Sequence, residues 1–395
     1  MIYLLVFILL LIPVVKYDWM AKTGGENKWY FFNLVILILL AGLRYRVGGD
    51  TLMYMSMYNE WPAMDELKYF DFEEALYNPL WYIYTSVAKS INEEFWVLQM
   101  IQAVIVNCTF FHFFRKYSPQ YYFSAILLYY VGYYCYFNME IMREILCICI
   151  LMLATDWLIE KKWIKYILAS ILAIQIHYSA ATMLLFPLFF IFLKKPSWTL
   201  QLVFMLAVLV VLNVVNVASL IVSVLPVDEN FGGLVEKYID LQTSFAGLMV
   251  QLLKYLPVLG FIFIRSRCPD IYSDKFAPIV MGVVFAYAMS MGFAGFERLV
   301  NYFTPFVIVF IVHTIYNFIS SMNLKNVQVS MMAMFASIVI LSFNYGYFYL
   351  RDMSEFYPNT RFNIIFSPYY SILNPEIDEQ REKFIENYRE VSFVF

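Results

Sequence analysis

Apolar stretches long enough to cross a lipid bilayer recur along almost the whole chain, and they limit its possible folds more than any other feature. A helix needs about 20 mostly apolar residues to span a membrane, and only helices or closed barrels satisfy their backbone hydrogen bonds there. Strands of a barrel would alternate apolar and polar residues, and these stretches do not. The sequence therefore predicts an all-α, polytopic integral membrane protein.

About 12 stretches are expected to form transmembrane helices, some of them shorter than the usual span. Hydrophobic residues make up 62% of the chain and charged residues only 14%, whereas about a quarter of the residues in a soluble domain are charged. The predicted spans are residues 2–15, 29–43, 95–113, 120–137, 143–159, 164–177, 178–193, 198–225, 249–264, 276–293, 299–319 and 328–350. One membrane domain, residues 1–350, and a polar tail, residues 351–395, follow from this pattern.

Lysine and arginine in the short loops predict the orientation, because cytoplasmic loops carry an excess of both. Loops such as 16–28 and 161–165 are basic and are assigned to the cytoplasmic side. The segments assigned to the outer side are 44–94, 138–142, 226–248, 294–298 and the tail 351–395. Within the first of these, residues 79–91 are aromatic but short, and we expect an interfacial or re-entrant helix there.

Charge and cysteine usage argue against several other classes of protein. A net charge of -3 gives no signal for nucleic acid. The five cysteines include no CxxC pair, so neither a zinc site nor a disulfide framework is expected. Nothing in the sequence requires a metal or another cofactor.

One polar segment follows the second predicted span directly. It runs Gly42-Leu43-Arg44-Tyr45-Arg46-Val47-Gly48-Gly49-Asp50-Thr51. On an extended chain Arg44 and Arg46 would point the same way, and Asp50 is well placed to cap a helix beginning at Thr51. A tight turn with interfacial arginines explains this segment equally well.

Further ionisable residues lie at the ends of predicted spans on the same outer side. They are Arg143, His177 and Arg298. Such residues are costly in a membrane and are often functional, and arginine binds phosphate through two parallel hydrogen bonds. The alternatives are an Arg143 pair with Glu140 three residues earlier and an Arg298 that pairs with Glu297 or reaches the lipid headgroups. Together the cations favour an outer site for an anionic lipid headgroup.

The segment from Gly42 to Thr51, with Tyr54 and Tyr58 after it, resembles the signature of the EpsG family. This family belongs among the Wzy-type polymerases of bacterial O-antigen, capsule and exopolysaccharide. Three later segments resemble family segments in the expected order; they are Asn138–Glu144, Ile176–Ser179 and Glu297–Tyr302. The resemblance extends from about residue 40 to residue 302, although Glu144 stands where the family usually has Gln.

The resemblance implies a membrane glycosyltransferase with a fold similar to the GT-C class, embedded in the bacterial inner membrane with its active site facing outward. The donor would be a growing glycan on polyprenyl (undecaprenyl) diphosphate, and the acceptor one repeat unit on the same carrier. Besides the lipid bilayer, a chain-length regulator and a flippase are candidate partners. A flippase or transporter of lipid-linked oligosaccharide, an O-antigen ligase and a membrane O-acyltransferase are the alternatives.

The matching positions also suggest roles for individual residues. The residues expected to hold the diphosphates and to neutralise the leaving group are Arg44, Arg46, Arg143 and Arg298. Arg143 and Arg298 are also counted as catalytic. The candidates for the general base are His177 and Asp50, ahead of Glu140 and Glu297. Sugar rings are expected to stack on Tyr45, Tyr54 and Tyr58, although membrane anchoring explains these tyrosines equally well.

Overall fold

The computed structural model consists of helices joined by turns and loops. It describes residues 1–69, 78–192, 203, 207, 260–265, 271–292, 297–321 and 349–394. Within these ranges no β-strand forms, and only isolated bridges such as Arg44 with Ser371 pair extended segments. The chain divides into two compact units: Met1–Leu184 with Asn326–Tyr388, and Leu185–Lys325 with Arg389–Phe395.

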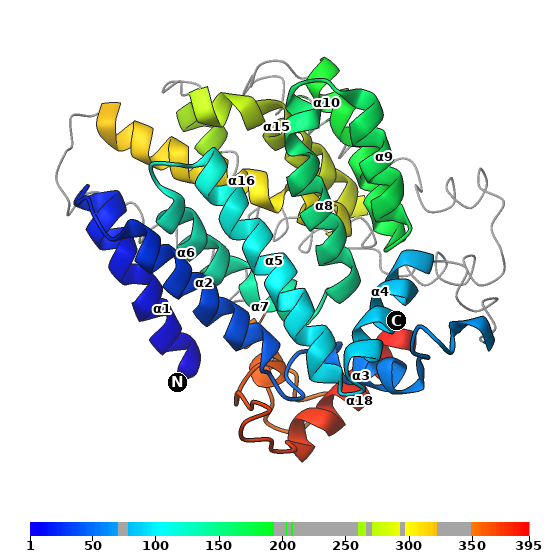
Figure 1. The fold of residues 1–395 in the computed structure, drawn as a ribbon. Coiled ribbons are helices and arrows are strands. Elements are labelled where there is room, and N and C mark those ends of the chain that lie inside the picture. Colours follow the sequence, from blue (N-terminus) through cyan, green and yellow to red (C-terminus); the bar gives the residue numbers. More distant parts are fainter. Residues whose placement is uncertain are drawn as a thin grey trace. The chain divides into compact units, whose positions relative to one another are not determined.

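The first unit is built around the long helix α5. Its helices are α1 (Ile2–Pro13), α2 (Glu26–Gly42), α3 (Thr51–Glu60), α4 (Pro79–Ile91), α5 (Phe95–Tyr117), α6 (Tyr122–Gly132), α7 (Tyr134–Met139), α8 (Met142–Ile159) and α9 (Trp163–Ile174). Helix α5 packs against α2, α4, α6 and α8 (Figure 1). The aromatic side chains of α5 fill this core, where Phe110 stacks on Tyr129 of α6 with 4.3 Å between ring centroids.

The second unit contains a pair of long helices, α15 (Ile271–Gly292) and α16 (Glu297–Ser321), which pack against each other, with α10 (Phe186–Phe192) against α15. Phe186 stacks on Phe303 of α16 with 4.7 Å between centroids. A Cβ atom at Gly282 would lie 2.8 Å from the ring of Phe189, so the absence of a side chain lets α10 approach α15.

Among the described residues, three helical stretches have the length and apolar composition to cross a bilayer: Ile2–Trp19, Phe95–Tyr117 and Arg298–Ser321. These stretches and the all-helical fold confirm the helical, membrane-protein character expected from the sequence. The total of about 12 spans and the GT-C-like fold stay predictions. The predicted spans 198–225 and 328–350 lie almost entirely outside the described residues, and so do the loop 226–248 and residues 249–259 of the span 249–264.

Several predicted segments differ in detail from the observed helices. The first span continues beyond α1 as a π-helix, Val14–Trp19. The segment predicted at 120–137 is divided at Tyr133, where the backbone leaves the helical region between α6 and α7. A helix forms at residues 79–91 as predicted, α4, with Pro79 at its first position, which suits a residue without an N–H group. Its interfacial position stays a prediction.

The chain also breaks near His177, between the predicted spans 164–177 and 178–193. Helix α9 ends at Ile174, and a 3₁₀-helix, Tyr178–Leu185, leads on from there. Residues 349–388 belong to the first unit, and Figure 1 shows this tail, coloured orange to red, beside the end of α2. The tail contains a short 3₁₀-helix, Phe362–Ile365, and helix α18 (Glu379–Val394).

Candidate functional site

The loop between α2 and α3 has a tight backbone that brings it against the start of α8. Arg46 and Gly48 have positive φ angles of 54° and 115°. A Cβ atom at Gly48 would lie 2.3 Å from the carbonyl oxygen of Met139, a distance that no side chain tolerates. Gly48 is therefore required for the loop to reach the segment that precedes Arg143.

Arg44 turns into the protein, and its side chain is 1% exposed. Its guanidinium donates to the carbonyl of Ala41, in the last turn of α2, and to that of Val47, with Nε 3.2 Å from the oxygen. Burial lowers the pKa of Arg44 to about 10. These contacts close the end of α2 and fix the loop, a common duty of a cation at a helix C-terminus.

Arg46 points elsewhere, so the expectation that Arg44 and Arg46 share a direction is wrong. The left-handed backbone of Arg46 breaks the extended geometry on which that expectation depends. The guanidinium of Arg46 forms an ion pair with Glu382 of α18, and its Nη1 lies 3.7 Å from the sulfur of Met55.

Arg143 is half-buried at the start of α8, on the side that faces α3. Its Nε lies 3.4 Å from the hydroxyl oxygen of Tyr54, and its Cζ lies 5.9 Å from the centre of that ring. No carboxylate of the described residues forms an ion pair with Arg143, so the alternative pair with Glu140 is not observed. The structure thus joins two of the predicted site residues, Arg143 and Tyr54, and leaves the arginine charge available to a ligand.

Asp50 occupies the N-cap position of α3, and the helix begins at Thr51 as predicted. Its side chain makes no capping hydrogen bond, so the predicted capping role is wrong. Instead, Asp50 interacts electrostatically with Glu140, whose Oε1 atom is buried without a hydrogen-bond partner among the described residues. The backbone of Gly49 runs beside the same carboxyl group, since a Cβ atom there would lie 3.7 Å from Oε2.

The environment of Glu140 favours the neutral form of its carboxyl group. Burial raises its pKa well above the ordinary value, and the negative charge of Asp50 raises it further. Two carboxyl groups in one place with different proton affinities are a frequent arrangement in acid–base sites. Here the group with the raised pKa is Glu140.

The raised pKa of Glu140 predicts a pH-dependent effect of Glu140→Gln. As far as Glu140 is concerned, the free energy of unfolding is highest below about pH 4.3, the pKa of Glu in an unfolded chain, because the buried carboxyl group is neutral there. It declines as the pH rises toward the raised pKa. Glutamine is neutral at every pH, so the melting temperature of the variant should exceed that of the parent protein increasingly between about pH 5 and pH 8. Thermal unfolding in detergent measures this, with exposed Glu93→Gln as the control; equal pH profiles would contradict the assignment.

The tyrosines after the loop are buried and line a small pocket. Tyr54 and Tyr58 are 5% and 0% exposed, and the hydroxyl of Tyr58 donates to the carbonyl of Asn92 at 2.8 Å. Trp61 stacks on Tyr82 with 3.9 Å between ring centroids. The pocket is lined by Tyr54, Tyr58, Trp61, Trp81, Tyr82 and Thr85. Tyr45 is half-buried, and its backbone N–H donates to Tyr370 of the tail at 2.9 Å.

His177 is 3% exposed and follows Ile176, which packs on the same apolar cluster as Tyr54 and Met142. Its Nδ1 accepts a hydrogen bond from the backbone N–H of Ser179 at 3.3 Å, and the hydroxyl oxygen of Ser179 lies 2.6 Å away. Because a backbone N–H can only donate, the neutral ring carries its proton on Nε2. In this tautomer the basic nitrogen is Nδ1, which already contacts Ser179.

Arg298 lies near the start of α16 in the second unit and is exposed. Its predicted association with the arginines of the first unit stays a prediction, and so does the part assigned to Glu297.

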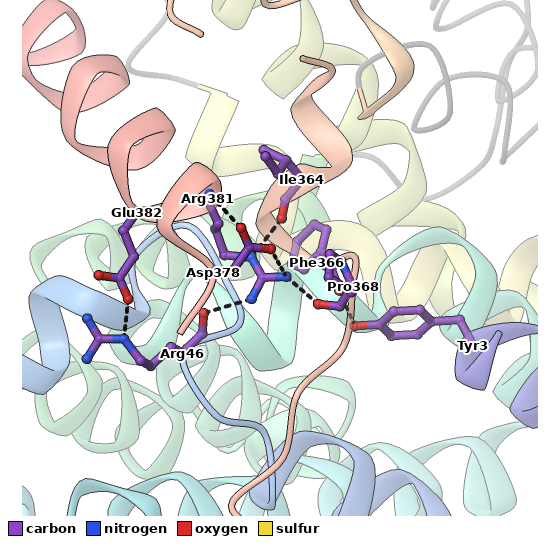
Figure 2. Close-up of polar contacts among 8 residues, drawn as sticks. All are labelled: Tyr3, Arg46, Ile364, Phe366, Pro368, Asp378, Arg381 and Glu382. Carbon is purple, nitrogen blue, oxygen red and sulfur yellow. Dashed lines mark hydrogen bonds and ion pairs between the residues drawn. The ribbon is translucent and has the colours of Figure 1, made fainter. Parts of the chain in front are cut away.

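Arg381 is a further candidate, and the sequence analysis missed it. It is 1% exposed, and its guanidinium donates to three carbonyl oxygens (Figure 2), those of Ile364, Arg46 and Pro368. Burial lowers its pKa. A usable signal was present: Arg381, Phe384, Ile385 and Tyr388 have the spacing of one helix face, which predicts that this face is covered.

Comparison with known proteins agrees with the resemblance seen in the motifs. The sequence model of the EpsG family matches residues 27–373, which include the loop after α2, the start of α8, His177 and Arg298. Neither the curated proteins nor the solved structures gave a match. Because the family match covers most of the chain, the chain belongs to the EpsG family.

Proposed function

We propose that this chain is a polysaccharide polymerase, which joins polyprenyl-diphosphate-linked repeat units at the outer face of the bacterial inner membrane. Membership of the EpsG family suggests a polymerase-like role. The observation that carries the proposal is Arg143, a half-buried arginine without a carboxylate partner among the described residues, next to a glycine-containing loop that supplies Arg46. A half-buried cation of this kind is suited to a ligand with strong negative charge, such as a lipid diphosphate.

The reaction transfers the growing glycan from one carrier to the next repeat unit. An acceptor hydroxyl loses its proton to a base, and its oxygen forms a bond to the anomeric carbon of the donor. The bond between that carbon and the diphosphate oxygen breaks, and the lipid diphosphate leaves with the electron pair. Arg46 and Arg143 would stabilise this developing charge, and a part for Arg298 stays a prediction.

In this proposal Arg44 keeps the shape of the loop and does not contact the diphosphate, because its guanidinium is directed at the carbonyls of Ala41 and Val47. Asp50 and His177 are the candidates for the base. Contact of a sugar ring with Tyr45, Tyr54 and Tyr58 stays a prediction, because the pocket that Tyr54 and Tyr58 line has room for only about one water molecule.

A defined assay tests the proposal directly. The purified protein, reconstituted in liposomes with lipid-diphosphate-linked repeat units and no nucleotide sugar, should form a ladder of products that differ by one repeat unit. Movement of unpolymerised units across the bilayer would instead indicate a flippase, and transfer that requires added lipid core would indicate a ligase. Either result, without a ladder, would overturn the polymerase assignment.

A further inference from the structure

The C-terminal tail lies directly on the loop that carries Arg46. Backbone hydrogen bonds join Gly48 N–H to the Ile365 carbonyl at 2.8 Å and Ile372 N–H to the Leu43 carbonyl at 2.9 Å. The hydroxyl of Tyr369 also donates to the carbonyl of Leu40 at 2.9 Å. The tail is therefore an integral part of the loop structure.

Helix α18 presents two neighbouring charged residues to Arg46. Asp378 fixes the start of the helix, because its Oδ1 accepts from the backbone N–H of Arg381 at 3.0 Å, as an N-cap does. Arg381 then donates from Nη1 to the carbonyl of Arg46 at 3.2 Å, and Glu382 pairs with the guanidinium of Arg46 (Figure 2). Backbone and side chain of Arg46 are thus held by consecutive residues of one helix.

The hydrogen bond from Arg381 to Arg46 is buried, whereas the ion pair between Glu382 and Arg46 is partly exposed. Arg381 is 1% exposed and bonded to three carbonyls, so it is a fixed structural support. The side chains of Arg46 and Glu382 are 22% and 28% exposed, so water and a ligand can reach their ion pair. A carboxylate on a guanidinium occupies the donors that a phosphate group would use, because both anions accept hydrogen bonds from the same fork.

We propose that α18 controls the availability of Arg46: Arg381 is a positioning residue for its backbone, and Glu382 holds its guanidinium until a lipid diphosphate displaces the carboxylate. This inference rests on the proposed function, in which Arg46 contacts the diphosphate. It makes the tail part of the substrate site and gives the site an internal competitor for its anionic ligand.

The experiment measures binding of geranylgeranyl diphosphate to the full chain in detergent by isothermal titration calorimetry. Glu382→Gln removes the competing charge and keeps the size of the side chain. It should lower the Kd about fivefold, the factor expected from a partly exposed ion pair. Damage to the structure would weaken binding, so a gain in affinity separates competition from a purely structural role. Exposed Glu386→Gln on the same helix makes the same change in net charge and should leave the Kd unchanged.

Two further variants distinguish the inference from the function on which it rests. Arg46→Gln should weaken binding of the probe, and the double variant with Glu382→Gln should bind no better than Arg46→Gln alone. Suppose that Arg46→Gln weakens binding of the probe, but that the Kd of Glu382→Gln equals that of the parent protein or of Glu386→Gln. The control by α18 is then overturned, and the role of Arg46 in binding diphosphate stands. If Arg46→Gln binds like the parent, the diphosphate role of Arg46 falls, and this inference falls with it.

Discussion

Replacing Arg143 with alanine is expected to lower the rate of polymer formation by at least about 100-fold, the usual effect of removing one group that stabilises charge in a transition state. Arg143 is half-buried, and its partner is the hydroxyl and ring of Tyr54. Its loss therefore leaves no buried carboxylate unpaired among the described residues, and the variant should fold. The initial rate of ladder formation in liposomes measures the effect, and thermal unfolding measures the folding.

Two control variants make this prediction specific. Arg143→Lys keeps the charge but not the planar fork and should recover only part of the rate. Arg115 on α5 also lies over a tyrosine, with its Cζ 4.8 Å from the ring centre of Tyr30, but the predicted topology places it on the cytoplasmic side. Arg115→Ala should keep the parent rate. Full activity in Arg143→Ala would contradict a role of this arginine in stabilising the charge of the leaving group.

Local signals in the sequence predicted the elements that begin or end with a residue of special geometry. Helix α3 begins at Thr51, directly after Asp50, and α4 begins at Pro79, where a proline is favoured. The break before Tyr178 was also expected, because a polar group interrupts two apolar runs there. Each of these features is determined by residues close to it in the chain, so it can be predicted from the sequence alone.

The contacts that distinguish Arg44 from Arg46 could not be predicted in this way. Both are arginines in one short loop, yet one is buried on carbonyl oxygens and the other meets a carboxylate of the tail. The decisive contact of Arg381 is with the backbone of a residue 335 positions away. Every residue has a main-chain carbonyl group, so the sequence does not indicate which of them accepts the hydrogen bond.

The second large effect is expected at the general base, where the structure favours Asp50 over His177. The Nδ1 nitrogen of His177 is already engaged by the backbone N–H and the hydroxyl group of Ser179. The Asp50 side chain makes no capping hydrogen bond and lies close enough to Glu140 to raise the pKa of that carboxyl group. As a general base, the Asp50 carboxylate would accept the proton of a sugar hydroxyl.

Asp50→Asn should therefore lower the polymerisation rate by about 10²–10⁴-fold, the usual contribution of a general base. Asparagine is as favourable as aspartate at a helix N-cap, so α3 should persist and the melting temperature should change little. Exposed Asp65→Asn in the same predicted outer segment removes one charge at a distance and should keep the parent rate. His177→Gln should lose less activity than Asp50→Asn, because glutamine can still accept from the N–H of Ser179. An inactive His177→Gln protein that melts like the parent, together with an active Asp50→Asn protein, would restore His177 as the base.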